Sequence, residues 1–188
     1  MTRVPAILDE HFRAAAGASA ELDVAFDVLE ETPVGPLLVG VSEHGLCRVT
    51  FDPEPEQELE RLARAFGPRV LRSSRPVDRA RRELDEYLAG RRKTFDLELD
   101  LRATPEFHRR VLAELARVGY GRTTTYGALA AQAGSPRAAR AVGTAMNRNP
   151  VPIVLPCHRV VGASGSLVGY GGGLERKEWL LRLEGAIL

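Results

Sequence analysis

The chain has 188 residues, of which 44% are hydrophobic and 27% charged, and its formal net charge is +1. This length suits one domain with a small companion, and the composition supports a packed core and excludes a disordered chain. No apolar run reaches the roughly 18 residues that a membrane span needs. Two cysteines are too few for a disulfide framework or a four-ligand zinc site. Charged residues interrupt residues 1–20, so we expect no secretory signal there and a cytoplasmic location.

The small net charge conceals a division along the chain. Residues 1–100 carry 14 Lys and Arg against 20 Asp and Glu, whereas residues 101–188 carry 12 against 5. Residues 115–174 contain no carboxylate but six arginines: Arg117, Arg122, Arg137, Arg140, Arg148 and Arg159. Such a stretch creates the positive field that a polyanion such as nucleic acid follows. The alternative is a core of small and apolar residues that needs few charges.

The first half predicts a small α/β unit. Apolar and polar residues alternate over residues 24–28, 37–41 and 47–51, with Gly and Pro turns between them. This pattern predicts a three-stranded antiparallel meander. Apolar residues then recur at helical spacing over residues 59–66 and 77–88, and the alternation over residues 95–101 predicts a further strand that closes the unit. Nothing in this half indicates chemistry, and Cys47 is interpreted as a core thiol.

The second half predicts helices and then an irregular segment. Thr104-Pro105-Glu106 is a helix start, the cluster Thr123–Thr125 can cap a second helix, and Ser135-Pro136 can cap a third that runs towards Asn149. Two short helices joined at Gly134-Ser135 are typical of a helix-turn-helix, although many such corners bind nothing. We therefore expect an α+β fold. An N-terminal extension (1–20) precedes a small α/β domain with an antiparallel sheet (21–102) and a mostly helical domain with the helix-turn-helix (103–188).

The expected third helix carries a basic face with little steric bulk. Arg137, Arg140 and Thr144 follow at spacings that place them on one face of a helix. The small residues Ala138, Ala141, Gly143 and Ala145 surround them. This combination favours insertion into a DNA groove. The alternative is a packing helix whose arginines are only solvated.

The segment from Asn149 to Val160 is the most informative for chemistry. Its three prolines, which precede Cys157, hold the chain extended or kinked and so fix a thiol in position. A cysteine beside a histidine is a candidate activated nucleophile, in which His158 acts directly or through a water. Glu184 is the best-placed carboxylate to orient His158, with Glu175 and Glu178 as competitors. A buried inert thiol is the common alternative, and a Cys-His hydrolase is another.

These motifs resemble the methylated-DNA–protein-cysteine methyltransferase family, also called O6-alkylguanine-DNA alkyltransferases. The resemblance covers residues 107–185 and rests on Pro156-Cys157-His158-Arg159-Val160, its proline-rich approach, and the segment Ser135 to Gly143. The first hundred residues agree only in general plan. A protein of this family repairs DNA by moving an alkyl group irreversibly from O6 of guanine to its own cysteine.

The resemblance implies a role for each matching residue. Cys157 accepts the alkyl group, His158 acts through a water, Glu184 orients His158, and Asn149 braces the turn. Tyr126 rotates the target phosphate and donates a proton, and Arg140 fills the gap that the flipped base leaves. The expected DNA contacts are Tyr126, Arg137, Ala139, Arg140, Ala141, Gly143 and Thr144. The expected pocket residues are Pro152, Val168, Gly169, Tyr170, Gly171 and Gly172.

Two departures from the family pattern bear on this interpretation. Gly171 stands where some members carry a serine that donates to the lesion oxygen, so the range of substrates can differ. The cysteine and histidine cluster that holds zinc in some members is absent, so no metal or other cofactor is predicted.

The expected partner is double-stranded DNA with alkylated bases, bound through the minor groove by a monomer. The rival interpretation is a module that recognises lesions without transfer.

Overall fold

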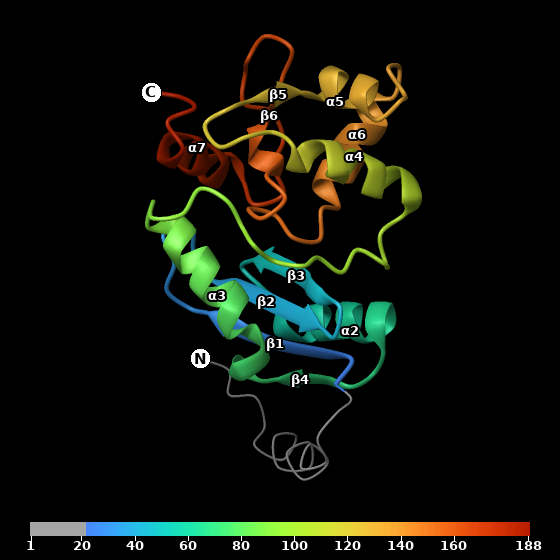
Figure 1. Ribbon diagram of the computed structural model, residues 1–188, viewed down its shortest axis with the longest axis vertical. Helices are drawn as coiled ribbons and strands as arrows, with labels where there is room; N and C mark the ends of the chain where they lie inside the picture. The colour runs from blue at the N-terminus through green and yellow to red at the C-terminus, as the bar shows by residue number, and fades with distance from the viewer. Residues whose placement is uncertain (1–21) are drawn as a thin grey trace.

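A computed structural model describes residues 22–188, so the expected extension over residues 1–20 lies outside the described residues. Figure 1 shows a sheet with two helices in one half of the molecule and a helical region in the other. One cluster of buried apolar side chains extends through both halves, from Ala25 on the sheet to Leu180 in the last helix. None of the described helices is long and apolar enough to cross a membrane.

The predicted meander is confirmed. Strands β1 (Val24–Leu29), β2 (Leu37–Ser42) and β3 (Gly45–Phe51) pair antiparallel in sequence order. A short fourth strand, β4 (Val70–Arg72), pairs parallel with β1, so the sheet order is β3-β2-β1-β4. Sequence reasoning missed β4 because three residues are too short to display alternation.

The two predicted helices of this half are confirmed and cover opposite faces of the sheet. Helix α2 (Pro55–Phe66) buries Leu62 against one face, together with Cys47. Helix α3 (Ser74–Leu88) buries Leu84 against the other face, which continues into the core of the helical region. Both faces of the sheet are therefore covered by apolar side chains.

The expected strand over residues 95–101 is wrong. The segment pairs with β3 only through an isolated bridge between Leu46 and Leu99. The backbone N–H of Asp96 donates instead to the carboxylate of Glu83 at 2.8 Å, which takes it out of any ladder. The apolar side chains of the segment still pack on the core, and this produced the alternating pattern.

The C-terminal half contains the helices that the sequence predicts. Its elements are α4 (Glu106–Ala116), β5 (Thr124–Thr125), α5 (Tyr126–Gln132), α6 (Ala139–Asn147), η1 (Cys157–Arg159), β6 (Val160–Val161) and α7 (Leu174–Leu183). The Thr125 hydroxyl accepts from the backbone N–H of Ala128 at 3.2 Å and so caps α5 as expected. The two-residue parallel ladder between β5 and β6 was not predicted.

Two expected helix starts are displaced. The capping residue of α4 is Pro105, one position after the expected Thr104. Helix α6 begins at Ala139 and not after Ser135-Pro136, because these residues form a turn in which the Ala138 N–H donates to the Ser135 carbonyl at 2.8 Å. As a result, Arg137 precedes α6 and does not share a helical face with Arg140 and Thr144.

Candidate active site

The proline-rich approach forms a tight turn that delivers Cys157 to the first position of η1. Within it Ile153 has a φ of 74°, a conformation that strains a β-branched residue. Asn149 braces the turn on both sides, because its Nδ2 donates to the Leu155 carbonyl at 2.8 Å and its Oδ1 accepts from the Val151 N–H at 3.1 Å. The turn is therefore fixed by hydrogen bonds that only an amide side chain at this position supplies.

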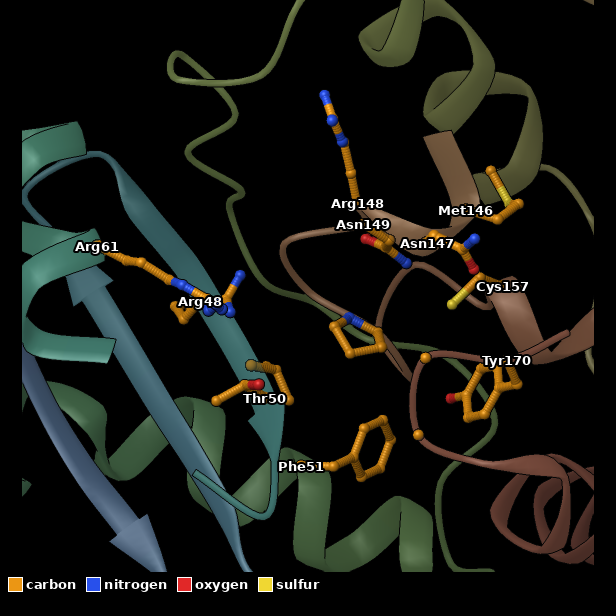
Figure 2. Close-up of a pocket in the computed structure, with 14 residues that line it drawn as sticks. Arg48, Thr50, Phe51, Arg61, Met146, Asn147, Arg148, Asn149, Cys157 and Tyr170 are labelled. Carbon is orange, nitrogen blue, oxygen red and sulfur yellow. The ribbon is translucent and has the colours of Figure 1, made fainter. Parts of the chain in front are cut away.

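Cys157 is 6% exposed and borders a cavity of about 520 Å³, into which its sulfur points in Figure 2. Burial raises the pKa of the thiol to about 11, and a hydrogen bond with Asn149 partly opposes this rise. The resting group is therefore a thiol at neutral pH, and a nucleophilic thiolate requires removal of its proton.

His158 and Glu184 form a fully buried pair behind Cys157. The His158 Nε2 atom lies 2.8 Å from Glu184 Oε1, and among the described residues its Nδ1 atom has no hydrogen-bond partner. Arg159 holds the same carboxylate at 2.8 Å, and the Gly121 N–H donates to Oε2 at 3.0 Å. The Tyr87 hydroxyl of α3 also donates to Glu184 Oε1.

The charges of this pair are fixed by their surroundings. Burial alone would raise the pKa of Glu184, but hydrogen bonds from His158 and Arg159 outweigh it and hold the pKa at about 2. Burial lowers the pKa of His158, against the opposite influence of Glu184. At neutral pH the site thus combines an ionised carboxylate with a neutral imidazole, which is the form that accepts a proton.

Tyr126 stands at the start of α5, and its hydroxyl donates to the Val168 carbonyl at 3.4 Å. Burial, and then the charge of a Cys157 thiolate, raise the pKa of Tyr126, so its hydroxyl keeps its proton at neutral pH. The buried Lys177 ammonium ties the same loop to the core by donating to the carbonyls of Val160 at 2.6 Å and Val168 at 2.7 Å. The loop that Tyr126 contacts is therefore held to the core by Lys177.

The glycine-rich loop supplies part of the cavity wall but not all of the expected residues. Pro152, Tyr170, Gly171 and Gly172 line the cavity, whereas Val168 and Gly169 do not. A Cβ atom on Gly172 would lie 2.8 Å from the ring of Phe51, which explains why this close approach requires glycine. Phe51 comes from β3, so the N-terminal half forms the opposite wall (Figure 2).

The outer surface of α6 is open and carries one cation, Arg140. Arg140, Ala141 and Thr144 are exposed, whereas Ala139 and Gly143 are partly covered. The ring of Tyr126 lies 3.9 Å from the position that a Gly143 Cβ would take, which brings the start of α5 against α6. The face that Arg140 and Thr144 share therefore adjoins the Tyr126 side chain.

Sequence reasoning missed three buried polar residues of the site: Tyr87, Arg159 and Lys177. Tyr87 follows the apolar stripe of α3, so its spacing indicated only a core aromatic residue. Arg159 and Lys177 are buried cations, which proteins retain only with partners. Their positions beside the Cys-His motif and in the carboxylate-poor half were the available signal.

The fold and the site together define an α+β protein in which a His–Glu pair adjoins the buried Cys157 at the edge of a cavity. Profiles of two domain families match the chain. Residues 28–101 match "6-O-methylguanine DNA methyltransferase, ribonuclease-like domain" and residues 106–186 match the "DNA binding domain" of the same proteins. A methylated-DNA–protein-cysteine methyltransferase of Methanosarcina acetivorans is 42% identical over 156 residues, covering 83% of this chain and 96% of the relative. One of Mycobacterium tuberculosis is 46% identical over 154 residues, covering 82% and 88%.

Solved structures agree with these relatives. The crystal structure of Mycobacterium tuberculosis OGT in complex with DNA matches with a TM-score of 0.74 and 37% identity, covering 86% of this chain and 93% of that one. The O6-methylguanine-DNA methyltransferase of Pyrococcus kodakaraensis matches with a TM-score of 0.59 and 28% identity, covering 86% and 99%. The chain belongs to the methylated-DNA–protein-cysteine methyltransferase family, and its C-terminal half is a DNA-binding domain of that family.

Proposed function

We propose that this protein repairs DNA by transferring an alkyl group from O6 of guanine to Cys157, once per molecule. The observation that carries the proposal is the setting of Cys157, a fixed thiol that faces a cavity and adjoins a neutral histidine paired with an ionised glutamate. Among the residues of the described chain, Cys157 alone combines a cavity, an adjacent imidazole and a rigid turn. The other cysteine, Cys47, borders a separate cavity, but it lies on strand β3 and its sulfur donates to the Gly40 carbonyl.

The reaction is a displacement at a saturated carbon. The Cys157 sulfur forms a bond to the alkyl carbon while the bond from that carbon to O6 breaks, and the electron pair stays with guanine. A soft thiolate suits this attack better than an oxygen nucleophile. The product is a thioether, which water does not readily cleave, so each molecule reacts once and needs no cofactor.

Two proton transfers complete the balance. His158 takes the proton of Cys157 through a water, and the ionised Glu184 stabilises the imidazolium that forms. Tyr126 keeps its proton at neutral pH and donates it towards the departing guanine, which neutralises the developing charge. Each group begins in the protonation state that its role requires.

The substrate is duplex DNA from which the damaged base has been turned out. Helices α5 and α6 act as a helix-turn-helix that enters the minor groove, and the exposed Arg140 fills the space that the base leaves. The small side chains of Ala141 and Gly143 allow the helix to approach the DNA backbone. The protein acts in the cytoplasm as a monomer in this proposal.

The test is the intact mass of the protein after incubation with an oligonucleotide that carries one O6-methylguanine. We expect a gain of one methyl group per molecule, and peptide mapping should locate it on Cys157. A Cys157→Ala variant should gain nothing while it still binds the oligonucleotide, and a Cys47→Ala variant is the matched control that should react fully. Tight DNA binding by the unchanged protein without any gain of mass would refute transfer and indicate a lesion-recognition module.

A further inference from the structure

The cavity beside Cys157 is cationic, with arginines from both halves of the chain. Three of the residues that line it are arginines: Arg48 from β3, Arg61 from α2 and Arg148 after α6. None of the described residues along its wall is Asp or Glu. Figure 2 shows Arg48 and Arg61 across the open space from Cys157. We call these three side chains the arginine wall.

The positive charge of the arginine wall is only partly balanced. The single carboxylate of Glu58 accepts from Arg48 Nε at 2.7 Å and from Arg61 Nη1 at 2.8 Å. Arg148 is exposed and forms no ion pair with any described residue. The lining therefore has three guanidinium groups, two of which share one carboxylate, and this leaves a net positive field in that part of the cavity.

Space continues beyond the arginine wall. A second cavity of about 360 Å³ is lined by the same three arginines, by Cys47 and by Asp100, whose carboxylate is paired with Arg102, and it reaches His108. Transfer of a methyl group needs neither this volume nor this charge. A longer substituent on O6 would extend from the Cys157 sulfur across the cavity towards Arg48 and Arg61, which lie on its far side in Figure 2.

We propose that the arginine wall selects O6-alkyl groups that end in a carboxylate over neutral groups of the same shape. The inference rests on the proposed function, since it concerns the same transfer to Cys157. The sulfur–carbon bond forms and the bond from carbon to O6 breaks as before, the electron pair leaves with guanine, and the carboxylate is carried unchanged onto the cysteine. The arginines take no part in bond making, so they are specificity-determining residues.

The test compares duplexes whose O6-alkylguanine ends in a carboxylate with duplexes that end in the matching carboxamide, at one and at three methylene groups. The readout is the ratio of acid to amide single-turnover rates within each protein. We expect a ratio on the order of tenfold in the unchanged protein. It should fall about threefold in Arg148→Gln and to near one in Arg48→Gln/Arg148→Gln, in which Glu58 keeps Arg61 as its partner.

The control is Arg64→Gln, on the same helix as Arg61 but outside the cavity lining, and it should keep the full ratio. A ratio of one in the unchanged protein overturns the inference. So does an equal slowing of acid and amide substrates with weaker binding of unmodified duplex, because the arginines would then serve the DNA phosphates. A protein that transfers methyl groups but shows either result retains the proposed function, whereas absence of methyl transfer refutes both.

Discussion

Cys47 on β3 and Cys157 on η1 are both buried thiols, yet different groups face the two sulfurs. The Cys47 Sγ donates to the Gly40 carbonyl at 3.3 Å, and burial followed by the charge of Asp100 raises its pKa to about 12. Burial also raises the pKa of Cys157, with Asn149 and the Lys177 ammonium acting in the opposite direction, as Arg102 and Arg48 do at Cys47, but at Cys157 no carboxylate of the described residues opposes them. Burial by itself therefore does not separate a structural thiol from a nucleophile. The two thiols are distinguished by the charges around each sulfur and by the imidazole beside Cys157.

The substitution Glu184→Gln should reduce the difference in reactivity between Cys157 and Cys47 the most. The amide cannot stabilise a charged His158 and leaves Arg159 buried without its carboxylate, so Cys157 should behave more like Cys47. We expect methyl transfer to slow by a factor of about 100 or more and the free energy of unfolding to fall by about 3 kcal/mol. Single-turnover kinetics and urea unfolding measure the two quantities.

The matched control for that change is Glu178→Gln, an exposed carboxylate on α7 that pairs with Arg182 at the surface. This variant should change the free energy of unfolding by less than about 1 kcal/mol and leave the transfer rate as it was. If both variants transferred methyl groups at the normal rate, the His–Glu pair would have no part in activating Cys157.

A second effect appears as a dependence of stability on pH. The pKa of Glu184 is about 2 in the folded protein against an ordinary 4.5, so its interactions stabilise the fold above pH 4.5 and are lost as pH falls towards 2. The loss should reach about 3 kcal/mol. The lowered pKa of His158 adds a further loss below its ordinary value of 6.5, because protonation then favours the unfolded chain.

Urea unfolding between pH 7 and pH 3 checks this dependence. The unchanged protein should lose stability more steeply than Glu184→Gln below pH 4.5, since glutamine does not titrate. Parallel curves for the two proteins would mean that Glu184 is not the group responsible.

The smallest effect should follow from Asp100→Asn. Its carboxylate, which accepts from the Ser42 hydroxyl at 2.6 Å, raises the pKa of Cys47. Removal of the charge should lower that pKa by less than about one unit. Cys47 should still alkylate slowly, because its sulfur stays buried and donates to the Gly40 carbonyl. Mass spectrometry of iodoacetamide labelling between pH 8 and pH 10 follows each thiol separately. Labelling of Cys47 as fast as Cys157 would show that charge alone decides reactivity.

The sequence was sufficient to predict the meander and most helices, because these depend on the local spacing of apolar residues. It was also sufficient for the Cys157–His158 motif, because that combination of residues after three prolines is uncommon. It could not indicate the contributions of the N-terminal half. Tyr87 contacts Glu184, which lies 97 positions further along the chain. In the sequence, Arg48 is only one of the polar residues that alternate with apolar ones in β3. Side chains that meet only when two regions pack leave no periodic signal. The segment 95–101 has the alternation of a strand but pairs with β3 only at Leu46, and the N–H of Asp96 donates to the Glu83 side chain, a contact that alternation does not predict.

The hydroxyl group of Tyr87 gives the N-terminal half a share in the active site, because α3 supplies one of the donors that hold Glu184. A fragment trimmed to the C-terminal half would keep every residue of the Cys-His motif and lose this donor. Loss of the Tyr87 hydrogen bond, which helps to hold the pKa of Glu184 low, would raise the pKa of the carboxylate. A shortened form that is to keep the reactivity of Cys157 should therefore retain α3, or replace its tyrosine with another donor to Glu184.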